Sequence, residues 1–300
     1  MKRIGFLVAV LLLAPGFGCA AESYAARGLV LKVDRAHSSV LISCERIPDY
    51  MEAMVMSFPV RDPDELTDLN VGVTVEFTLV VEQQSFHIEN IRLHRYESVE
   101  QDPIAARRLK LMARILEGSD QAQPLKIQEP VPNFALVDQE QQSVSLSQFS
   151  GKVVVLTFTY THCALPNFCF RIANHFRLLQ KRFANELGRD LIFVTVTFDP
   201  AHDTPEIMAK YGKTWNADPA SWKLLTGTPS EVQKICNSFG ISFWADEGLM
   251  THSLHTFVLD RARRLVADLE GNEFTADELG DLVQTVLARD ARSSLHASTH

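Results

Sequence analysis

The chain has 300 residues, a hydrophobic fraction of 46% and a charged fraction of 22%, which are ordinary values for a soluble globular protein. These values argue against a disordered chain, a collagen-like chain and a multi-span membrane protein, and the length predicts two domains. With 29 Lys and Arg against 37 Asp and Glu, the net charge is −8, so nucleic acid is not an expected partner. Five cysteines are too few for a disulfide scaffold. Because five is odd, at least one cysteine is unpaired, removed by processing or bound to something else.

The start of the chain has the pattern of an export signal. Lys2 and Arg3 precede an apolar run at 4–14, and small residues follow. We predict a signal peptide at 1–21, which places the mature protein in the oxidising periplasm; a buried helix is the alternative. Cys19 could instead carry a lipid anchor, and this would be the chain's one expected attachment to a membrane.

Residues 25–96 are predicted to form a small all-β domain. Leu29, Leu31 and Val33 alternate with polar or basic residues, as in a half-buried strand. Further strands are predicted at 40–43, 71–81 and 86–93. Several short strands separated by turns are typical of a small antiparallel barrel.

A methionine-rich segment lies between these strands. Met54 and Met56 are two residues apart, so on a strand they would point to one face. Thioethers and thiolates, here including Cys44, are soft ligands that favour Cu(I). The alternative is that these methionines only fill the core of the barrel.

The order of residues in this segment resembles a known copper-binding domain. Ile47-Pro48 and Met51-Glu-Ala-Met54-Val-Met56-Ser-Phe58 are similar to the OB domain of periplasmic copper-efflux chaperones of the CusF-like type. The resemblance implies that Cys44, Met54 and Met56 are copper ligands, with Cys44 at the family's histidine position. A domain that keeps the fold without the metal is the alternative.

The remaining chain is predicted to form a helical linker, an α/β domain and a tail. Apolar residues at 102–118 have helical spacing, and the linker is placed at 97–125. From 126 to 290, apolar β-branched runs alternate with helix-period stretches, which is typical of a parallel sheet with crossover helices. The strands are predicted at 153–158, 191–198 and 256–259, and the helices at 170–187, from Thr204-Pro205 and at 275–288. Residues 291–300 are predicted to be a disordered tail.

Two cysteines follow the first strand of this α/β domain. Cys163 and Cys169 lie between a buried strand and a helix, where α/β folds place active residues. The two sulfurs could form a disulfide, or they could bind a metal that needs a third ligand. His252 is the leading candidate for that ligand, and His255 is its competitor. Cys236 lies on an apolar helical face and is predicted to be a buried structural thiol.

Sequence motifs over more than half of the chain resemble the Sco/SenC family of copper-dependent assembly proteins. They are Pro132-Asn133-Phe134, Leu146-Ser147, Gly151-Lys152, Phe158-Thr-Tyr160-Thr161-x-Cys163, Thr197-Phe198-Asp199-Pro200-x-His202-Asp203-Thr204-Pro205, Leu225-Thr226-Gly227, Phe239-Gly240 and Thr251-His252-Ser253. The resemblance implies an α/β thioredoxin-like domain after the N-terminal OB-like barrel. Ala164 and Phe170 stand where the similar bacterial members have prolines.

The resemblance implies one copper ion bound by Cys163, Cys169 and His252. Two thiolates hold Cu(I), and an added imidazole lets the same site hold Cu(II); zinc also fits such ligands. Asp203 and Asp260 are candidates for orienting the ligands or the loop around them.

The resemblance further implies a copper metallochaperone that helps to assemble the dinuclear copper centre of cytochrome c oxidase. Its partners would be the copper-receiving oxidase subunit and a copper donor protein, and the barrel could relay copper to Cys163 and Cys169. The alternative is a thiol–disulfide oxidoreductase that uses these two cysteines as a redox pair. His252 discriminates between the two hypotheses, because disulfide exchange does not need it. A peroxidase is disfavoured, since no separate peroxidatic cysteine is evident.

Overall fold

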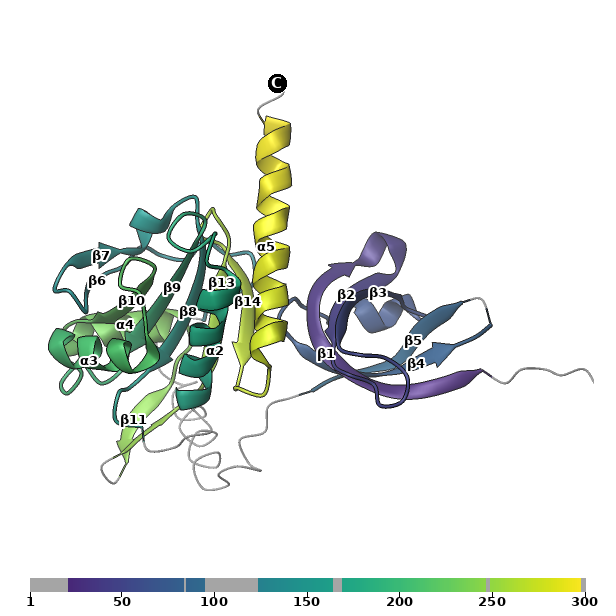
Figure 1. The fold of residues 1–300 in the computed structure, drawn as a ribbon, viewed down its shortest axis with the longest axis horizontal. Helices are drawn as coiled ribbons and strands as arrows, with labels where there is room; N and C mark the ends of the chain where they lie inside the picture. The colour runs from purple at the N-terminus through teal and green to yellow at the C-terminus, as the bar shows by residue number, and fades with distance from the viewer. Residues whose placement is uncertain (1–20, 84, 95–123, 164–168, 247–248, 298–300) are drawn as a thin grey trace, which may run out of the picture.

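The computed structural model describes residues 21–83, 85–94, 124–163, 169–246 and 249–297. The predicted signal peptide, Cys19 and most of the predicted linker at 97–125 lie outside these ranges. An N-terminal β-barrel and a larger α/β domain lie side by side, and helix α5 (Ala276–Ala297) runs between them (Figure 1). Within the described ranges, no helix combines the length and the hydrophobicity needed to cross a bilayer.

The N-terminal domain is a five-stranded antiparallel sheet that closes on itself. Its strands are β1 (Glu22–Asp34), β2 (Ser39–Cys44), β3 (Met54–Pro59), β4 (Thr74–Val81) and β5 (Phe86–Leu93), in the order β3-β2-β1-β4-β5. A parallel bridge between Val60 and Ile88 joins the two outer edges, and the amide of Arg61 donates to the carbonyl of Ile88 at 3.0 Å. This connection gives the OB-like barrel, so the predicted all-β domain is confirmed.

Gly72 explains why β4 begins at Thr74 and not at the predicted residue 71. Its φ of +91° belongs to the left-handed region, which glycine adopts without steric cost. A Cβ atom at this position would also lie 2.7 Å from the Cβ of Ala267 in the other domain. The glycine therefore provides both the turn into β4 and the close approach of the two domains.

The second domain is built on a seven-stranded mixed sheet. Its strands are β6 (Ala135–Asp138), β7 (Ser143–Ser145), β8 (Val153–Thr159), β9 (Leu191–Thr197), β10 (Trp222–Thr226), β13 (His255–Leu259) and β14 (Leu265–Glu270). The order is β14-β13-β8-β9-β10-β6-β7, with β8, β9 and β10 parallel. This is the thioredoxin-like fold that the resemblance to the Sco/SenC family implied.

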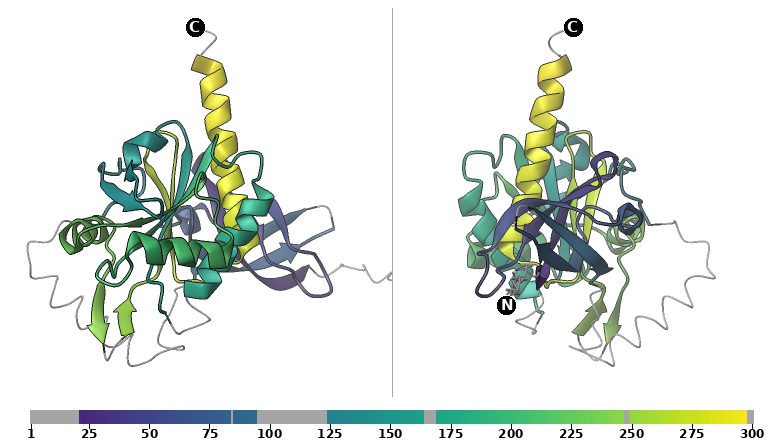
Figure 2. Two further views of the ribbon diagram at one scale, coloured as in Figure 1. Left: turned by 60° about the vertical axis from the view of Figure 1, so that its left-hand side comes forward. Right: turned by 90° about the vertical axis from the view of Figure 1, so that its right-hand side faces the viewer.

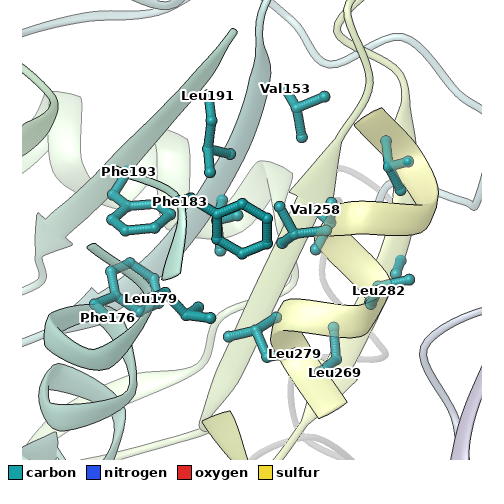
Figure 3. Packing of buried hydrophobic residues seen from close by; sticks show 14 of the residues in the cluster. Val153, Phe176, Leu179, Phe183, Leu191, Phe193, Val258, Leu269, Leu279 and Leu282 are labelled. Carbon is teal, nitrogen blue, oxygen red and sulfur yellow. The ribbon is translucent and has the colours of Figure 1, made fainter. Parts of the chain in front are cut away.

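Helices cover both faces of this sheet, which makes β8 buried on both sides. Helices α2 (Cys169–Arg182), α3 (Pro205–Trp215) and α5 share one core with Val153 and Val155, and α4 (Pro229–Ser238) shares the other with Val154 and Leu156. Figure 3 shows the first core, where Phe176 of α2 and Leu279 of α5 point toward the sheet. Successive side chains of a strand alternate between faces, so β8 reads as a continuous apolar run.

A short hairpin outside the main sheet carries one predicted ligand. Its strands are β11 (Phe243–Asp246) and β12 (Leu249–His252), paired so that Phe243 lies opposite His252. Figure 2 shows this hairpin extending away from the seven-stranded sheet.

Two helix boundaries bear on the predictions. Thr204 caps α3 as predicted, because its side chain accepts a hydrogen bond from the amide of Ile207. Helix α5 continues to Ala297, past the predicted end at residue 288 and into the predicted disordered tail at 291–300. The residues at 289–297 contain neither glycine nor proline, so the sequence itself does not terminate the helix.

The barrel packs against the α/β domain through β1 and β2. Leu29 and Leu31 of β1 are fully buried in the same core as Leu282 of α5. The hydroxyl of Ser43 donates to the carboxylate of Asp281 at 2.6 Å. The two domains therefore share a hydrophobic core and form one continuous structure.

Candidate metal centre

Cys163 follows the end of β8 at Thr159, and Cys169 is the first residue of α2; 5% and 4% of their surfaces are exposed. No disulfide forms among the described cysteines. A hydrogen bond between the Cys163 and Cys169 side chains and burial both raise the pKa of Cys169 above its usual value. The structure therefore brings together two sulfurs that are separated by five residues in the chain.

His252 completes this group from the β11–β12 hairpin. Its Nε2 atom lies 3.9 Å from the Sγ atom of Cys169. Its Nδ1 atom lies 2.9 Å from the carbonyl oxygen of Ser253, which can only accept, so Nδ1 carries the proton. Burial lowers the pKa of His252 to about 4, and the ring is neutral at neutral pH. A neutral ring protonated on Nδ1 presents the Nε2 lone pair to the sulfurs, as a metal ligand requires.

Two aromatic rings hold the imidazole in this orientation. The centroid of the Phe198 ring is 4.4 Å from that of His252, and the Tyr160 ring packs edge-on at 5.8 Å. Both aromatic residues are almost fully buried. The imidazole is thus held in place by packing, so a metal bound through Nε2 would cost little further side-chain entropy.

His255, the competing candidate, is engaged elsewhere. Its Nδ1 atom lies 2.8 Å from a carboxylate oxygen of Asp268 in β14, and its ring stacks on Phe257. Burial favours the neutral ring, but the Asp268 carboxylate outweighs it and raises the pKa of His255. The geometry therefore favours His252 as the third ligand.

Asp203 organises the segment that leads to Cys163. Its buried carboxylate accepts hydrogen bonds from the amide of Thr161 at 3.0 Å and from the hydroxyl of Thr197 at 2.6 Å. These bonds tie together the ends of β8 and β9. Asp260 has a different role, because its side chain accepts from the amides of Ala262 and Arg264 in the β13–β14 turn.

The barrel residues Cys44, Met54 and Met56 share one face of the β2–β3 pair. Cys44 lies directly opposite Met54, and Met56 lies opposite Ile42. Directly opposed side chains in an antiparallel pair lie on the same side, with Cβ atoms about 5 Å apart. Cys44 is 2% exposed and Met54 is 48% exposed, so the face passes from the core to the barrel's outside. Burial raises the pKa of Cys44 to about 11, and a bound metal would have to displace its proton.

Cys236 is fully buried on α4, within the core shared with Val232 and Phe239. Burial raises the pKa of its thiol to about 12. The structure thus agrees with the prediction of a structural thiol.

Sequence reasoning did not predict the groups that orient His252, which are the rings of Tyr160 and Phe198 and the carbonyl of Ser253. Tyr160 and Phe198 follow the ends of β8 and β9, and only the carboxyl-end rule for parallel strands pointed to that edge. The Ser253 carbonyl carries no sequence signal, because every residue has one.

Comparison with known proteins gives the class of this chain. Residues 122–288 match the family model described as SCO1/SenC, and residues 23–93 match the one described as copper binding periplasmic protein CusF. The first match covers more than half of the chain, which therefore belongs to the SCO1/SenC family. The barrel is in turn similar to CusF.

The chain spans 56–64% of the length of the first curated relatives it matches. The chain is 26% identical over 154 residues to Protein sco1 of Schizosaccharomyces pombe, covering 49% of this chain and 56% of that one. It is 26% identical over 149 residues to the SCO1 protein homolog of Bacillus subtilis, covering 48% and 76%. A solved structure of Bradyrhizobium japonicum ScoI with copper bound is 26% identical and covers 53% of this chain and 99% of that one, with a TM-score of 0.43.

Proposed function

We propose that this protein is a copper metallochaperone of the cell envelope that helps to load the dinuclear copper centre of a cytochrome c oxidase. Cys163, Cys169 and His252 hold the copper. The observation that carries the proposal is the 3.9 Å approach of His252 Nε2 to Cys169 Sγ, with the other ring nitrogen already hydrogen-bonded. The predicted export signal and the match of the barrel to a periplasmic protein support the location.

The donor set explains why the cargo is copper. Two thiolates and one imidazole stabilise Cu(I) in a low-coordinate site, and the imidazole also suits Cu(II). A site with these donors can therefore hold copper in either oxidation state. The partner that receives the copper is the copper-binding subunit of the oxidase, as family membership implies.

Anaerobic titration of the full chain with Cu(I) tests this site. We expect His252→Ala to weaken Cu(I) binding at the cysteine pair by at least tenfold, because one of three ligands is lost. His255→Ala is the matched control, since it removes a nearby partly buried imidazole and leaves the ligands in place. Equal affinity of the two variants, or a purified protein that holds only zinc, would contradict the proposal.

The barrel is proposed to hold a second copper ion at Cys44, Met54 and Met56. The shared face of these side chains supports this role, together with the similarity to CusF. A full chain carrying Cys163→Ser and Cys169→Ser should still bind one Cu(I). Adding Met54→Ala to that chain should abolish this binding. Val55→Ala is the control, because the exposed Val55 neighbours Met54 on the opposite face of β3.

We further propose that the barrel passes copper to the cysteine pair within one chain. If it does, Met54→Ala should slow the loading of Cys163 and Cys169 from a copper–glutathione complex by about tenfold, while the final occupancy stays the same. Unchanged loading kinetics would show that the cysteine pair takes up copper directly.

The thiol–disulfide oxidoreductase hypothesis is not favoured. Disulfide exchange needs an accessible thiolate, whereas both cysteines are at least 95% buried in the structure. An oxidoreductase would reduce a protein disulfide, and the His252→Ala variant would do so at the same rate as the unsubstituted protein.

A further inference from the structure

A second group of potential metal ligands lies next to the cysteine pair and takes no part in it. His162 follows β8, and Asp199 and His202 follow β9, so all three lie at the carboxyl edge of the sheet. One ligand atom from each residue lies within 4.8 Å of the other two. The Nε2 atom of His162 is 3.7 Å from a carboxylate oxygen of Asp199, and the two imidazole rings have centroids 4.4 Å apart.

The surroundings of His202 resemble those of a metal-bound histidine. Its Nδ1 atom lies 3.0 Å from a carboxylate oxygen of Asp203, which is completely buried. Histidines that bind metal commonly donate their second ring nitrogen to such a carboxylate, which leaves Nε2 unprotonated and turned outward. Asp203 is itself held by Thr161 and Thr197, so this orientation is built into the fold.

The exposure of the group differs from that of the cysteine pair. The side chains of His162, Asp199 and His202 are 35%, 20% and 50% exposed. Ligand atoms around one zinc ion lie about 3.4 Å apart, at bond lengths of about 2.1 Å. The exposed rings can rotate over the remaining distance, so an ion could enter from solvent without opening the core.

We propose that His162, Asp199 and His202 form a second metal site that binds a divalent transition-metal ion, with Cu(II) held most tightly and Zn(II) more weakly. Two imidazoles and a carboxylate are borderline and hard donors, which suit divalent ions and disfavour Cu(I). Divalent ions bind a given set of such donors in an order that peaks at Cu(II). This site goes beyond the proposed Cu(I) centre, with which it shares no ligand.

The two sites are physically connected through Tyr160. The Tyr160 ring packs against His162 at a centroid distance of 4.8 Å and against His252 at 5.8 Å, nearly perpendicular to both imidazoles. His162 also directly precedes Cys163 in the chain. The proposed site therefore lies next to the Cu(I) centre and is more exposed to solvent than the buried cysteines.

Titration with Cu(II) in the full chain carrying Cys163→Ser, Cys169→Ser and His252→Ala tests the site separately from the Cu(I) centre. We expect one Cu(II) whose electron paramagnetic resonance spectrum shows coupling to nitrogen. Adding His202→Ala or Asp199→Asn should reduce its affinity at least tenfold. His37→Ala is the matched control, because His37 is an exposed histidine that contacts a carboxylate, Asp34, in the barrel.

A second measurement avoids the substituted cysteines. Unsubstituted protein first saturated with Cu(I) should bind one additional Zn(II), and His202→Ala should weaken this binding at least tenfold while leaving the Cu(I) content unchanged. If neither protein binds a divalent ion, or if His202→Ala binds it as tightly as His37→Ala, the three side chains form only a surface ion-pair group and the proposal is overturned. A loss of Cu(I) with unchanged Zn(II) would also overturn it.

Discussion

The guanidinium of Arg27 in the barrel lies 3.0 Å from the carboxylate of Glu273 in the thioredoxin-like domain. The same carboxylate oxygen lies 2.7 Å from Nε2 of His94 in the barrel. One acidic side chain of the second domain thus binds two residues from opposite ends of the first, which helps to hold the two domains in a single orientation.

Glu273→Gln should weaken this contact. Burial opposes ionisation of Glu273, but hydrogen bonds from His94 and Arg27 lower its pKa, so it is charged at neutral pH. The side chains of Arg27 and Glu273 are each 29% exposed. Solvent screening therefore limits the loss of unfolding free energy to about 1 kcal/mol. Urea unfolding at low and at high salt measures the effect, which should shrink as salt rises. Glu89→Gln, which breaks the more exposed pair with Arg61, is the control; an equal loss there would argue against an interdomain role.

His175 should make the protein sensitive to mild acid. Its Nδ1 atom is buried without a hydrogen-bond partner among the described residues, and burial lowers its pKa to about 4. Between the usual histidine pKa of about 6.5 and a pH of about 4, His175 is protonated in the unfolded chain and stays neutral in the folded chain. Stability therefore falls as the pH drops from 6.5 to 4, by up to about 3 kcal/mol from this group. His175→Phe, which can still pack against Phe274, should remove that part of the slope in urea unfolding at several pH values.

If the unsubstituted protein and His175→Phe lose stability in parallel between pH 6.5 and 4, His175 is protonated in the folded state. The proposed origin of the pH dependence would then be wrong.

Asp203→Asn should weaken Cu(I) binding at the proposed site, although Asp203 is not one of the proposed ligands. An asparagine cannot accept all the hydrogen bonds that Thr161, Thr197 and His202 direct at this carboxylate, and the segment before Cys163 loses its anchor. Loss of a supporting residue of this kind weakens metal binding by about 10- to 100-fold. Competition with a Cu(I) chelator measures the affinity. Asp260→Asn, in the distant β13–β14 turn, should lower stability alone; equal losses of affinity would mean that both act through global unfolding.

Cys236→Ala should distinguish the structural thiol from the proposed copper ligands Cys163 and Cys169. Removing a buried sulfur leaves a small cavity and should lower the unfolding free energy by about 1–2 kcal/mol. The Cu(I) stoichiometry should stay the same, whereas Cys169→Ala should abolish binding at the cysteine pair. Thermal unfolding and anaerobic titration of both variants measure these outcomes, and a drop in copper content in Cys236→Ala would make Cys236 a ligand.

Local pattern was enough to predict several elements of this protein, but not the strands β7, β10, β11, β12 and β14. Strand β8 is buried on both faces, and its sequence is accordingly an unbroken apolar run. Thr204-Pro205 predicts the start of α3 through the cap residue and the proline at the first helical position. Both signals depend on neighbouring residues only. The extension of α5 to Ala297 was not predicted. Residues 289–297 have neither a helix-breaking residue nor a strong apolar periodicity, so their sequence does not distinguish a helix from a coil.

The sequence by itself determined the two domains, the paired cysteines and the candidates for a third ligand. Only the tertiary structure placed His252 beside Cys169 while directing His255 to Asp268, and only it brought His162 to Asp199 and His202. The physical reason is the same in each case. A ligand set depends on distances between side chains that different strands deliver to one edge of the sheet, and those distances follow from packing over the whole domain.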